Sequence, residues 1–514
     1  MKFKSDVDGL VSGIRFYKSP RNTGTHVANL WSKSGALLAS TTFANETASG
    51  WQQVNFAQPV AITAGTTYVA SYHTNTGYYC IDRGYFATRG ADGGPLHALK
   101  DSTDGPNGVF VYGSASSFPA NTYQSSNYWV DVVITTPAPA TATACTGVQI
   151  DATFTADRIQ QLVSSNPNGT VFCFASGTYT INHYILLKEA NQFICKVRRT
   201  CVLTGLDQYR GAFDVQFDTA HQLIKGFVIE RFIAIIGSWP LAGLQMRDYG
   251  VMDDNEVRYC ETGIEGRSHQ TLRNNFIHHN RRYGISGGPL TDLLIENNEL
   301  SWNNTAHYDP NDNAGGSKIV GSQSGTTLLT WRGNYVHDNY GQGIWSDGNV
   351  RNVLYEANRI ENNTGAGIDH EISWDAIIRN NTLRNNNTAE LGVPKSCWHG
   401  SQIGVNNSQN VTTSGNTIES IGINPICMVN STRHETSVFP QSLGNISVQG
   451  NVIKMRGTVT VGMTGDTLPS NVKFSGNTYY VENINGVYWQ YMNSMTKAQW
   501  QAAGQDGAGT FLTW

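Results

Sequence analysis

Two carboxylates stand at the same distance from a repeated asparagine. The segments GNYVHDNYGQGIWSDG and ANRIENNTGAGIDHEI align without gaps, so that Asp347 lies thirteen residues after Asn334 and Glu371 thirteen after Asn358. Two acids at a fixed spacing can carry out acid–base and nucleophilic chemistry, and carboxyl groups about 5–5.5 Å apart are typical of retaining glycosidases. Whether these two acids meet depends on the elements that hold them.

The repeated asparagine predicts those elements. Each Asn is followed by alternating apolar residues, a polar turn, Gly-Ile and a second strand, and it recurs as Asn255, Asn275, Asn298, Asn334, Asn358, Asn381, Asn416, Asn451 and Asn477. A basic interval of about 20–25 residues suits one coil of a parallel β-helix, in which three strands and three turns close a rung. Leucine-rich and helical repeats are excluded, because neither a Leu consensus nor a 3.6-residue periodicity is present. We therefore predict an all-β protein whose larger part is a right-handed parallel β-helix with a stacked asparagine ladder.

Equal phase in neighbouring coils places Asp347 and Glu371 one above the other, about 4.8 Å apart along the axis. Because side chains alternate along a strand, Trp345 shares the face of Asp347, and Asp369 shares that of Glu371. We expect these four side chains to form a patch that points to solvent. Stacked carboxylates repel, so one of the pair is expected to have a raised pKa and to act as an acid. The alternative is that they keep the surface soluble or bind a structural cation.

Insertions lie beside this patch. Three intervals between successive asparagines are 35 or 36 residues long, and their extra residues fall at 304–325, 385–406 and 420–443. Insertions in coil repeats collect on the binding face. In the second insertion, Trp398 and His399 could line a groove in which an aromatic ring stacks on a sugar.

The first insertion carries polar side chains. His307, Tyr308 and Asp312 could contact sugar hydroxyls, or the Asp-Pro-Asn-Asp segment could simply form a turn. Lys318 follows Ala-Gly-Gly-Ser and is expected to join the patch as a general base, as a partner for a substrate carboxylate, or as a plain surface lysine.

The positions of three further residues in their strands predict where their side chains point. Arg267 and Glu265 occupy matching positions in the upstream segment GIEGRSH, and Arg267 is expected to contact substrate. His370 lies between the two acids of its strand, on the opposite face by alternation, and is expected to pack inside the coil.

The region before the repeats has a different sequence pattern. Residues 1–136 contain short alternating strands punctuated by turns, which predict a β-sandwich. A Pro/Ala/Thr segment at 137–144 is expected to be a stiff linker, and residues 145–514 to form the β-helix unit. Within that unit, Ala156–Val163 predicts a short amphipathic helix. Four aromatic residues of the sandwich could form a sugar-stacking surface or belong to the core: Trp31, Tyr78, Tyr79 and Tyr85.

Composition narrows the functional classes. Charged residues make up only 14%, the 53 glycines suit many turns, and a net charge of −4 offers no basic patch for nucleic acid. No apolar run is long enough to span a membrane. The partner is therefore expected to be a polysaccharide or oligosaccharide, and the protein is expected to be a monomer.

Cysteine usage suggests an oxidising compartment. The eight cysteines include no Cys-x-x-Cys pair, which favours scattered disulfides over zinc. Cys195 could pair with Cys201 and Cys145 with Cys173, whereas Cys260 could be a buried thiol. We expect a secreted protein whose export signal preceded residue 1.

The run from Gly315 to Asn381, with GGSK, GQGIWSDG and GAGIDHEIS, resembles a large group of secreted β-helix proteins. It is particularly similar to glycoside hydrolases of the β-xylosidase type, whose catalytic Asp and Glu would correspond to Asp347 and Glu371. The ending MTKAQWQAAGQDGAGTF also matches this group and implies a helix over the last coil. Residues 1–136 resemble an uncharacterised sandwich module of secreted bacterial enzymes, which implies an accessory role such as glycan binding.

Three functions follow from these features. A retaining glycoside hydrolase would use Asp347 and Glu371 and need no cofactor. A lyase acting on a uronic-acid polymer would, by analogy with lyases of this fold, use Lys318 or Arg267 as base, with Ca²⁺ held by Asp347, Asp369 and Glu371. A non-catalytic glycan-binding protein would only hold the polymer. An alginate C5-epimerase is disfavoured as a fourth alternative, because the segment YDPND lacks the His of the Asp-Pro-His motif of those enzymes.

Overall fold

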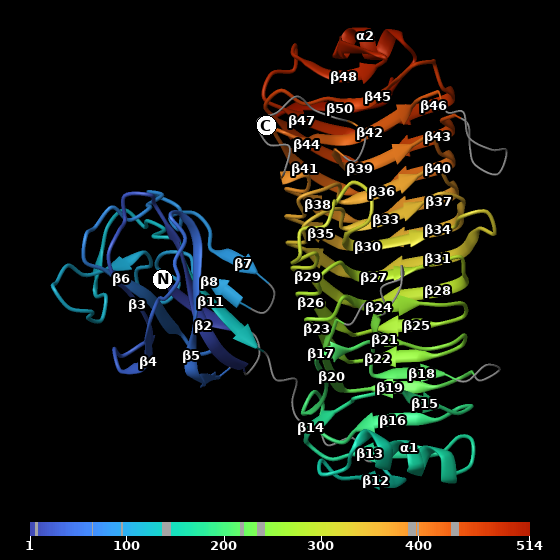
Figure 1. Ribbon diagram of the computed structural model, residues 1–514. Helices are drawn as coiled ribbons and strands as arrows, with labels where there is room; N and C mark the ends of the chain where they lie inside the picture. Colours follow the sequence, from blue (N-terminus) through green and yellow to red (C-terminus); the bar gives the residue numbers. More distant parts are fainter. Residues whose placement is uncertain are drawn as a thin grey trace. The chain divides into compact units, whose positions relative to one another are not determined.

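The computed structural model describes residues 1–5, 9–63, 65–93, 96–135, 145–215, 220–233, 242–388, 397, 400–432 and 442–514. The chain divides into two compact units, Met1–Thr141 and Ala142–Trp514, and each has its own apolar core (Figure 1). The segment 137–144, expected to be a linker, lies outside the described residues.

The first unit consists of antiparallel sheets around a core that includes Phe3, Ile14 and Phe16, as predicted for a β-sandwich. One sheet has the order β11 (Val130–Thr135), β2 (Gly9–Lys18), β5 (Gly50–Ile62). The other has the order β4 (Leu37–Thr42), β3 (His26–Ser32), β6 (Tyr68–Thr74), β1 (Lys2–Ser5), β8 (Leu96–Ala98), β7 (Ala91–Gly93). A short ribbon pairs β9 (Val109–Phe110) with β10 (Asn121–Thr122). The strands β4, β7, β8 and β10 were not predicted.

The structure decides between the two alternatives for Trp31. Trp31 is only 7% exposed, and its Nε1 donates to Ser71 Oγ at 2.9 Å, so it belongs to the interior and not to a stacking surface. Tyr78 is exposed, whereas Tyr79 and Tyr85 are half-buried.

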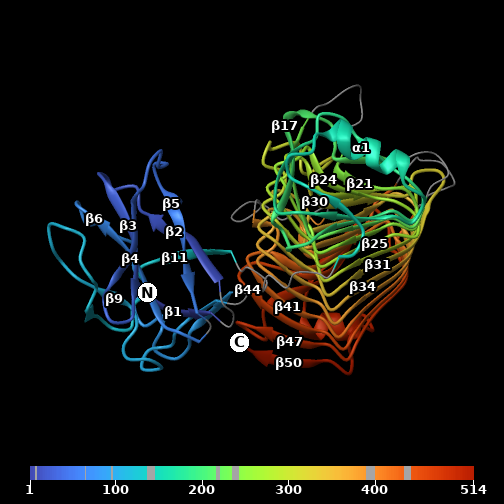
Figure 2. The ribbon, with the colours of Figure 1, turned by 90° about the horizontal axis from the view of Figure 1, so that it is seen from below.

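The second unit is a parallel β-helix of three sheets, each of which takes one strand from successive coils (Figures 1 and 2). The first sheet, over the described residues, contains β12 (Val148–Ile150), β13 (Val171–Phe174), β16 (Gln192–Cys195), β19 (Leu223–Lys225), β22 (Val251–Asp253), β25 (Thr271–Arg273), β28 (Thr291–Glu296), β31 (Thr326–Arg332), β34 (Val350–Glu356), β37 (Trp374–Arg379), β40 (Gln409–Ser414), β43 (Gly444–Gln449) and β46 (Ser470–Ser475). The second contains β14 (Gly177–Thr180), β17 (Cys201–Tyr209), β20 (Phe227–Phe232), β23 (Glu256–Arg258), β26 (Phe276–His278), β29 (Glu299–Ser301), β32 (Tyr335–His337), β35 (Arg359–Glu361), β38 (Thr382–Arg384), β41 (Thr417–Ile421), β44 (Val452–Arg456), β47 (Thr478–Val481) and β50 (Thr510–Thr513). The third contains β21 (Ala242–Gln245), β24 (Thr262–Gly266), β27 (Tyr283–Gly287), β30 (Gly315–Val320), β33 (Ile344–Asp347), β36 (Ile368–Glu371), β39 (Ser401–Asn406), β42 (Asn424–Asn430), β45 (Val461–Gly465), β48 (Val487–Tyr491) and the antiparallel β49 (Asn493–Thr496). A separate pair joins β15 (Ile185–Leu187) to β18 (Phe213–Val215).

The predicted asparagine ladder is confirmed. Asn255 Nδ2 donates to Asn275 Oδ1 at 3.2 Å, the same bond links each later pair, and Asn477 ends the row on Asp506 at 2.8 Å. Each of these amides is buried and bonded to the coils on both sides. Because a buried amide without partners is costly, the ladder fixes the register of the coils.

A second ladder was not predicted. It runs from coil to coil through Asn280, Asn303, Asn339, Asn363 and Asn386 and ends on Gln402. Each of its asparagines follows a member of the first ladder by five residues, so the signal was present in the sequence.

Helices cover both ends of the stack, as predicted. The helix α1 (Ala156–Ser165) buries Ile159 and Val163 in the core of the β-helix. At the other end, α2 (Lys497–Ala502) buries Trp500, whose ring lies 4.8 Å from that of Phe474.

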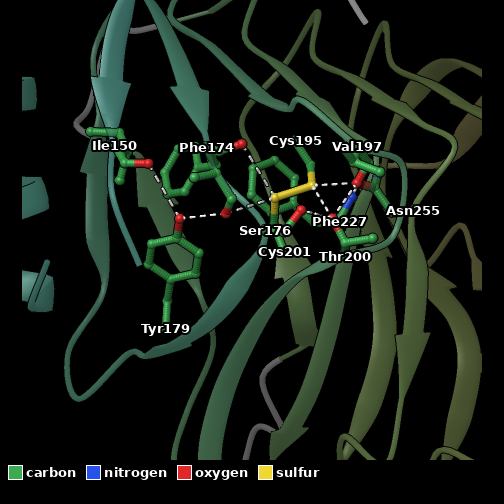
Figure 3. Close-up of a disulfide and its surroundings, with 11 residues drawn as sticks. Ile150, Phe174, Ser176, Tyr179, Cys195, Val197, Thr200, Cys201, Phe227 and Asn255 are labelled. Carbon is green, nitrogen blue, oxygen red and sulfur yellow. Dashed lines mark hydrogen bonds between the residues drawn. A yellow bond between two sulfur atoms is a disulfide. The ribbon is translucent and has the colours of Figure 1, made fainter. Parts of the chain in front are cut away.

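Disulfides tie the early coils. Both expected bonds are present, Cys145–Cys173 and Cys195–Cys201 (Figure 3), and a third joins Cys397 to Cys427. Cys260 is a buried free thiol, and burial raises its pKa to about 12. Among the described residues, no helix is long and apolar enough to cross a membrane.

Candidate active site

The predicted register of the two acids is confirmed. The strands β33 and β36 are neighbours in the third sheet, with Asp347 opposite Glu371 and Trp345 opposite Asp369. The carboxyl-bearing side chains therefore stand on one face of adjacent coils, one strand spacing of about 4.8 Å apart.

The expectation that this patch points to solvent was wrong for three of its four members. Trp345 is 1% exposed, Asp369 is inaccessible and Glu371 is 5% exposed, whereas Asp347 keeps about a fifth of its side chain accessible. The reason is that each side chain is covered by specific partners from neighbouring coils. Asp347 is thus the most accessible carboxylate of the group.

Lys318 joins the patch from the preceding coil, as predicted. Its Nζ lies 2.9 Å from Asp347 Oδ2, donates to the backbone oxygen of Asp312 at 2.6 Å, and stands 3.5 Å above the centroid of the Trp345 ring. An ammonium placed over an indole and against a carboxylate is held by cation–π attraction and by charge pairing. These contacts fix the side chains of Lys318 and Asp347 relative to each other.

Glu371 and Asp369 are bonded on the same face. Trp345 Nε1 donates to Glu371 Oε2 at 3.0 Å, and Asn406 Nδ2 donates to Asp369 Oδ1 at 2.9 Å. Gly404 lies opposite Asp369 in the next strand, and a Cβ there would come within 3.0 Å of Asp369 Oδ1. The absence of a side chain at Gly404 therefore leaves room for the Asp369 carboxylate.

A polar cluster lies directly behind the patch, inside the coil. Tyr355 donates to Ser346 Oγ at 2.7 Å, and its hydroxyl lies 3.1 Å from His370 Nδ1. All three residues are fully buried, which confirms that His370 faces inward. Burial lowers the pKa of His370 to about 3, so its imidazole is neutral.

The first insertion leans toward the upstream coils. Tyr308 donates its hydroxyl to Glu261 Oε1 at 2.9 Å, and the ring of His307 packs edge-on against that of Tyr340 with centroids 4.3 Å apart. These contacts of the two side chains are therefore with other protein residues and not with the four patch residues.

The Asp-Pro-Asn-Asp segment forms a turn. Asp309 accepts from the backbone N–H of Asn311 through its side chain at 2.9 Å and from that of Asn313 through its backbone oxygen at 3.1 Å. Asp312 contributes its backbone oxygen to Lys318, while its own side chain is exposed. The turn thus positions Lys318 over Trp345.

Arg267 does not join the patch. Its guanidinium pairs with Glu265 at 2.7 Å on β24, three strands away from β33 in the third sheet. Burial raises the pKa of Glu265, opposed by the positive charge of Arg267. Trp398 and His399 lie outside the described residues.

The donor set does not fit the proposed Ca²⁺. The carboxylates of Asp347, Asp369 and Glu371 each face an N–H or ammonium donor, whereas calcium needs six to eight oxygen ligands around one point. Over the described ranges, no group of three His, Cys, Asp or Glu residues could hold a metal ion.

Sequence reasoning missed Asn406 and Tyr355. Asn406 lies opposite Glu371, but the insertion between them breaks the gapless count from the ladder. Its Oδ1 is buried without a hydrogen-bond partner among the described residues. Tyr355 contacts Ser346 from the first sheet. Residue spacing within one strand does not predict such a contact across the interior of the coil.

Comparisons with known proteins agree with this architecture. The profile of a domain of unknown function, DUF4082, matches residues 1–130, and that of the right-handed β-helix region matches residues 263–439 and 318–499. No curated protein sequence matches the chain.

Three solved structures are similar to the chain. The mannuronan C-5 epimerase AlgE6 A-module from Azotobacter vinelandii is 15% identical, with a TM-score of 0.53, over 72% of this chain and 97% of its own. The catalytic unit of a thermostable GH87 α-1,3-glucanase from Streptomyces thermodiastaticus is 12% identical, with a TM-score of 0.51, over 100% and 87%. XylC in complex with xylose is 11% identical, with a TM-score of 0.52, over 72% and 86%. These likenesses establish the fold: the second unit is a right-handed parallel β-helix, as predicted.

Proposed function

We propose that the β-helix unit is a retaining glycoside hydrolase acting on a polysaccharide, with Asp347 and Glu371 as its catalytic pair. The observation that carries this proposal is their pairing on adjacent parallel strands. A strand spacing of about 4.8 Å suits the carboxyl separation of about 5–5.5 Å in retaining enzymes, whereas inverting enzymes need about 6.5–9.5 Å. The similar structures support a polysaccharide as the substrate, since two of them are named for acting on mannuronan and on an α-1,3-glucan.

We assign the nucleophile to Asp347 and the acid/base role to Glu371. Asp347 is the more accessible of the two, and the Lys318 ammonium compensates the negative charge that a nucleophilic carboxylate must carry. Glu371 is oriented by the Trp345 indole, whose Nε1 donates to Glu371 Oε2 at 3.0 Å.

The reaction then follows two displacements. An Asp347 oxygen bonds to the anomeric carbon while the glycosidic C–O bond breaks and Glu371 gives its proton to the departing sugar oxygen. Glu371 next takes a proton from water, whose oxygen bonds to the anomeric carbon and releases Asp347. Two inversions restore the original anomeric configuration.

The lyase alternative is less well supported. A lyase base must present a neutral amine to the sugar C5 proton, but Lys318 Nζ is engaged by Asp347, by Asp312 and by the Trp345 ring face. All three partners suit an ammonium. Arg267, the other candidate base, is paired with Glu265.

We also propose that the enzyme works outside the cytoplasm. Three disulfides join described cysteines, and such bonds persist in oxidising compartments. Large polysaccharides are met in the same compartments.

The test is a polysaccharide panel read for both new reducing ends and ultraviolet-absorbing unsaturated ends. Asp347→Asn and Glu371→Gln should each lower kcat/KM by about 10³-fold. Asp375→Asn is the matched control, because Asp375 is exposed and the equivalent position of the next coil is Asn410. Full rates in both site variants would refute the assignment, and unsaturated products would favour a lyase.

A further inference from the structure

Three rings form a column where the second sheet turns into the third. Tyr259, His279 and Trp302 each follow the last residue of a strand, namely β23, β26 and β29. The centroids of Tyr259 and His279 are 5.7 Å apart, and those of His279 and Trp302 are 6.2 Å apart with an angle of 23° between the rings. We call these three residues the aromatic column.

Local backbone preference does not select Tyr259 or Trp302. Tyr259, His279 and Trp302 have φ values of 55°, 54° and 55°. This left-handed region is enriched in Asn, Asp and His, whereas Tyr and Trp rarely adopt it. The same corner of the next three coils is also left-handed and carries Asp338, Asn362 and Asn385. Asn and Asp tolerate this conformation best, so Tyr259 and Trp302 need another explanation.

Core packing does not supply that explanation. Tyr259 and Trp302 are 46% and 43% exposed, so much of each ring remains in water. Burial and the positive charges of His278 and Arg258 lower the pKa of His279 to about 4, which keeps its ring uncharged at neutral pH. Contiguous exposed rings on a soluble protein mark a binding surface.

One insertion connects the aromatic column to the candidate active site. The insertion that begins after Trp302 runs back over the same coils: Thr305 N donates to Asn280 O at 3.1 Å, and Tyr308 donates to Glu261, two residues after Tyr259. The same insertion then reaches Lys318 through the backbone oxygen of Asp312.

We infer that the aromatic column is a second sugar-binding site that stacks on pyranose rings of the polysaccharide upstream of Asp347 and Glu371. One ring per coil spans about 10 Å along the axis from Tyr259 to Trp302, so an extended chain can contact all three. Aromatic faces suit the C–H faces of sugars, while polar groups such as Arg258, 5.7 Å from the Tyr259 ring, can bond hydroxyls. The identity of the polymer rests on the proposed function.

The variants Tyr259→Asn and Trp302→Asn test this inference. Both should fold, since Asn occupies the same corner in later coils, and circular dichroism with thermal unfolding checks this. Leu328→Asn is the control: Leu328 is 51% exposed with a φ of 59°, but it lies on the first sheet. Affinity electrophoresis of the full chain in gels with soluble xylan, carboxymethylated α-1,3-glucan or sodium alginate measures binding.

We expect at least one of the three polymers to slow the migration of the wild-type chain. Each column variant should bind that polymer about tenfold more weakly, the double variant more weakly still, and the control as tightly as wild type. Hydrolysis of short oligosaccharides should stay within about twofold of wild type. Column variants that bind like wild type, or a wild-type chain that binds none of the three polymers, would overturn the inference.

The two proposals fail separately. If the wild-type chain cleaves no polymer but the column variants bind more weakly than wild type, the column is supported and the hydrolase is refuted. Unchanged binding, together with loss of cleavage in Asp347→Asn, would support the hydrolase and refute the column.

Discussion

At the scale of single residues, the indole of Trp345 connects the lysine to the acid of the proposed pair. Replacing Trp345 by Phe keeps the ring under Lys318 but removes the N–H that donates to Glu371 Oε2 at 3.0 Å. A hydrogen bond to a charged group contributes about 1.5–3 kcal/mol, so we expect kcat to fall about 10–100-fold, measured as initial rates on the best substrate of the panel.

Trp331→Phe is the matched control. Trp331 is fully buried in the core, and its Nε1 has no hydrogen-bond partner among the described residues, so the same exchange removes no bond there. Equal activity in Trp345→Phe and Trp331→Phe would show that the indole N–H does not orient Glu371.

His370 makes the stability of the β-helix unit depend on pH. Its pKa is lowered to about 3 by burial, whereas an unfolded histidine titrates near 6.5. Between these values the unfolded chain binds a proton that the folded chain does not, so stability falls as pH falls through this window. Between pH 6.5 and pH 5, the free energy of unfolding of the wild type should fall by about 2 kcal/mol more than that of His370→Gln, as measured by urea titration.

Ile368→Val serves as the control for this experiment. Ile368 is buried on the same strand and does not titrate, so its cost of about 0.5–1.5 kcal/mol should not vary with pH. If the stability difference between wild type and His370→Gln is also independent of pH, His370 is not the cause of the acid sensitivity.

The residues that the sequence predicted correctly are those governed by period. Counting from the ladder placed Asp347 opposite Glu371 and turned His370 inward. Residue spacing gives the face on which a side chain lies but not the neighbours that cover it. The burial of Trp345 and Glu371 was therefore not predicted. It also failed to place Asn406, because the preceding insertion changes the length of the coil.

At the scale of elements, the asparagine ladders hold the coils in register. Asn381 Nδ2 donates to Tyr355 O and Asn416 Oδ1, and its Oδ1 accepts from Asn358. Asn381→Gly leaves several buried groups without partners, at about 1–3 kcal/mol each. We expect a loss of about 3 kcal/mol or more in the free energy of unfolding, measured by urea titration.

The adjacent Asn380→Gly makes the same exchange outside the ladder. Asn380 is exposed and has a φ of 57°, which glycine adopts readily, so the change should stay below about 1 kcal/mol. Equal costs at the two positions would mean that the ladder contributes little to stability.

The elements could be predicted to the extent that their signals repeat. Nine evenly phased asparagines revealed one ladder, and the second, five residues further on, was as regular but was not noticed. The aromatic column occupies a corner whose left-handed conformation shows only in the backbone of the structure. In the first unit, the sequence left open whether Trp31 lies on the surface or in the core, because alternation does not show which side of a strand faces the other sheet.

At the scale of the whole molecule, all described residues of the proposed active site lie in the second unit, which has its own core. A fragment of residues 145–514 should therefore hydrolyse short oligosaccharides within about twofold of the full-length rate. A loss above tenfold, with circular dichroism unchanged, would mean that residues of the first unit complete the site.

The anomeric configuration of the first product tests the central claim most directly. Proton NMR can record it within minutes of adding enzyme to a substrate of defined linkage, before mutarotation. A carboxylate pair one strand spacing apart predicts that the product keeps the anomeric configuration of the bond that was cleaved. A product of the opposite configuration, or an unsaturated sugar, would contradict the assignment of Asp347 and Glu371 as nucleophile and acid/base.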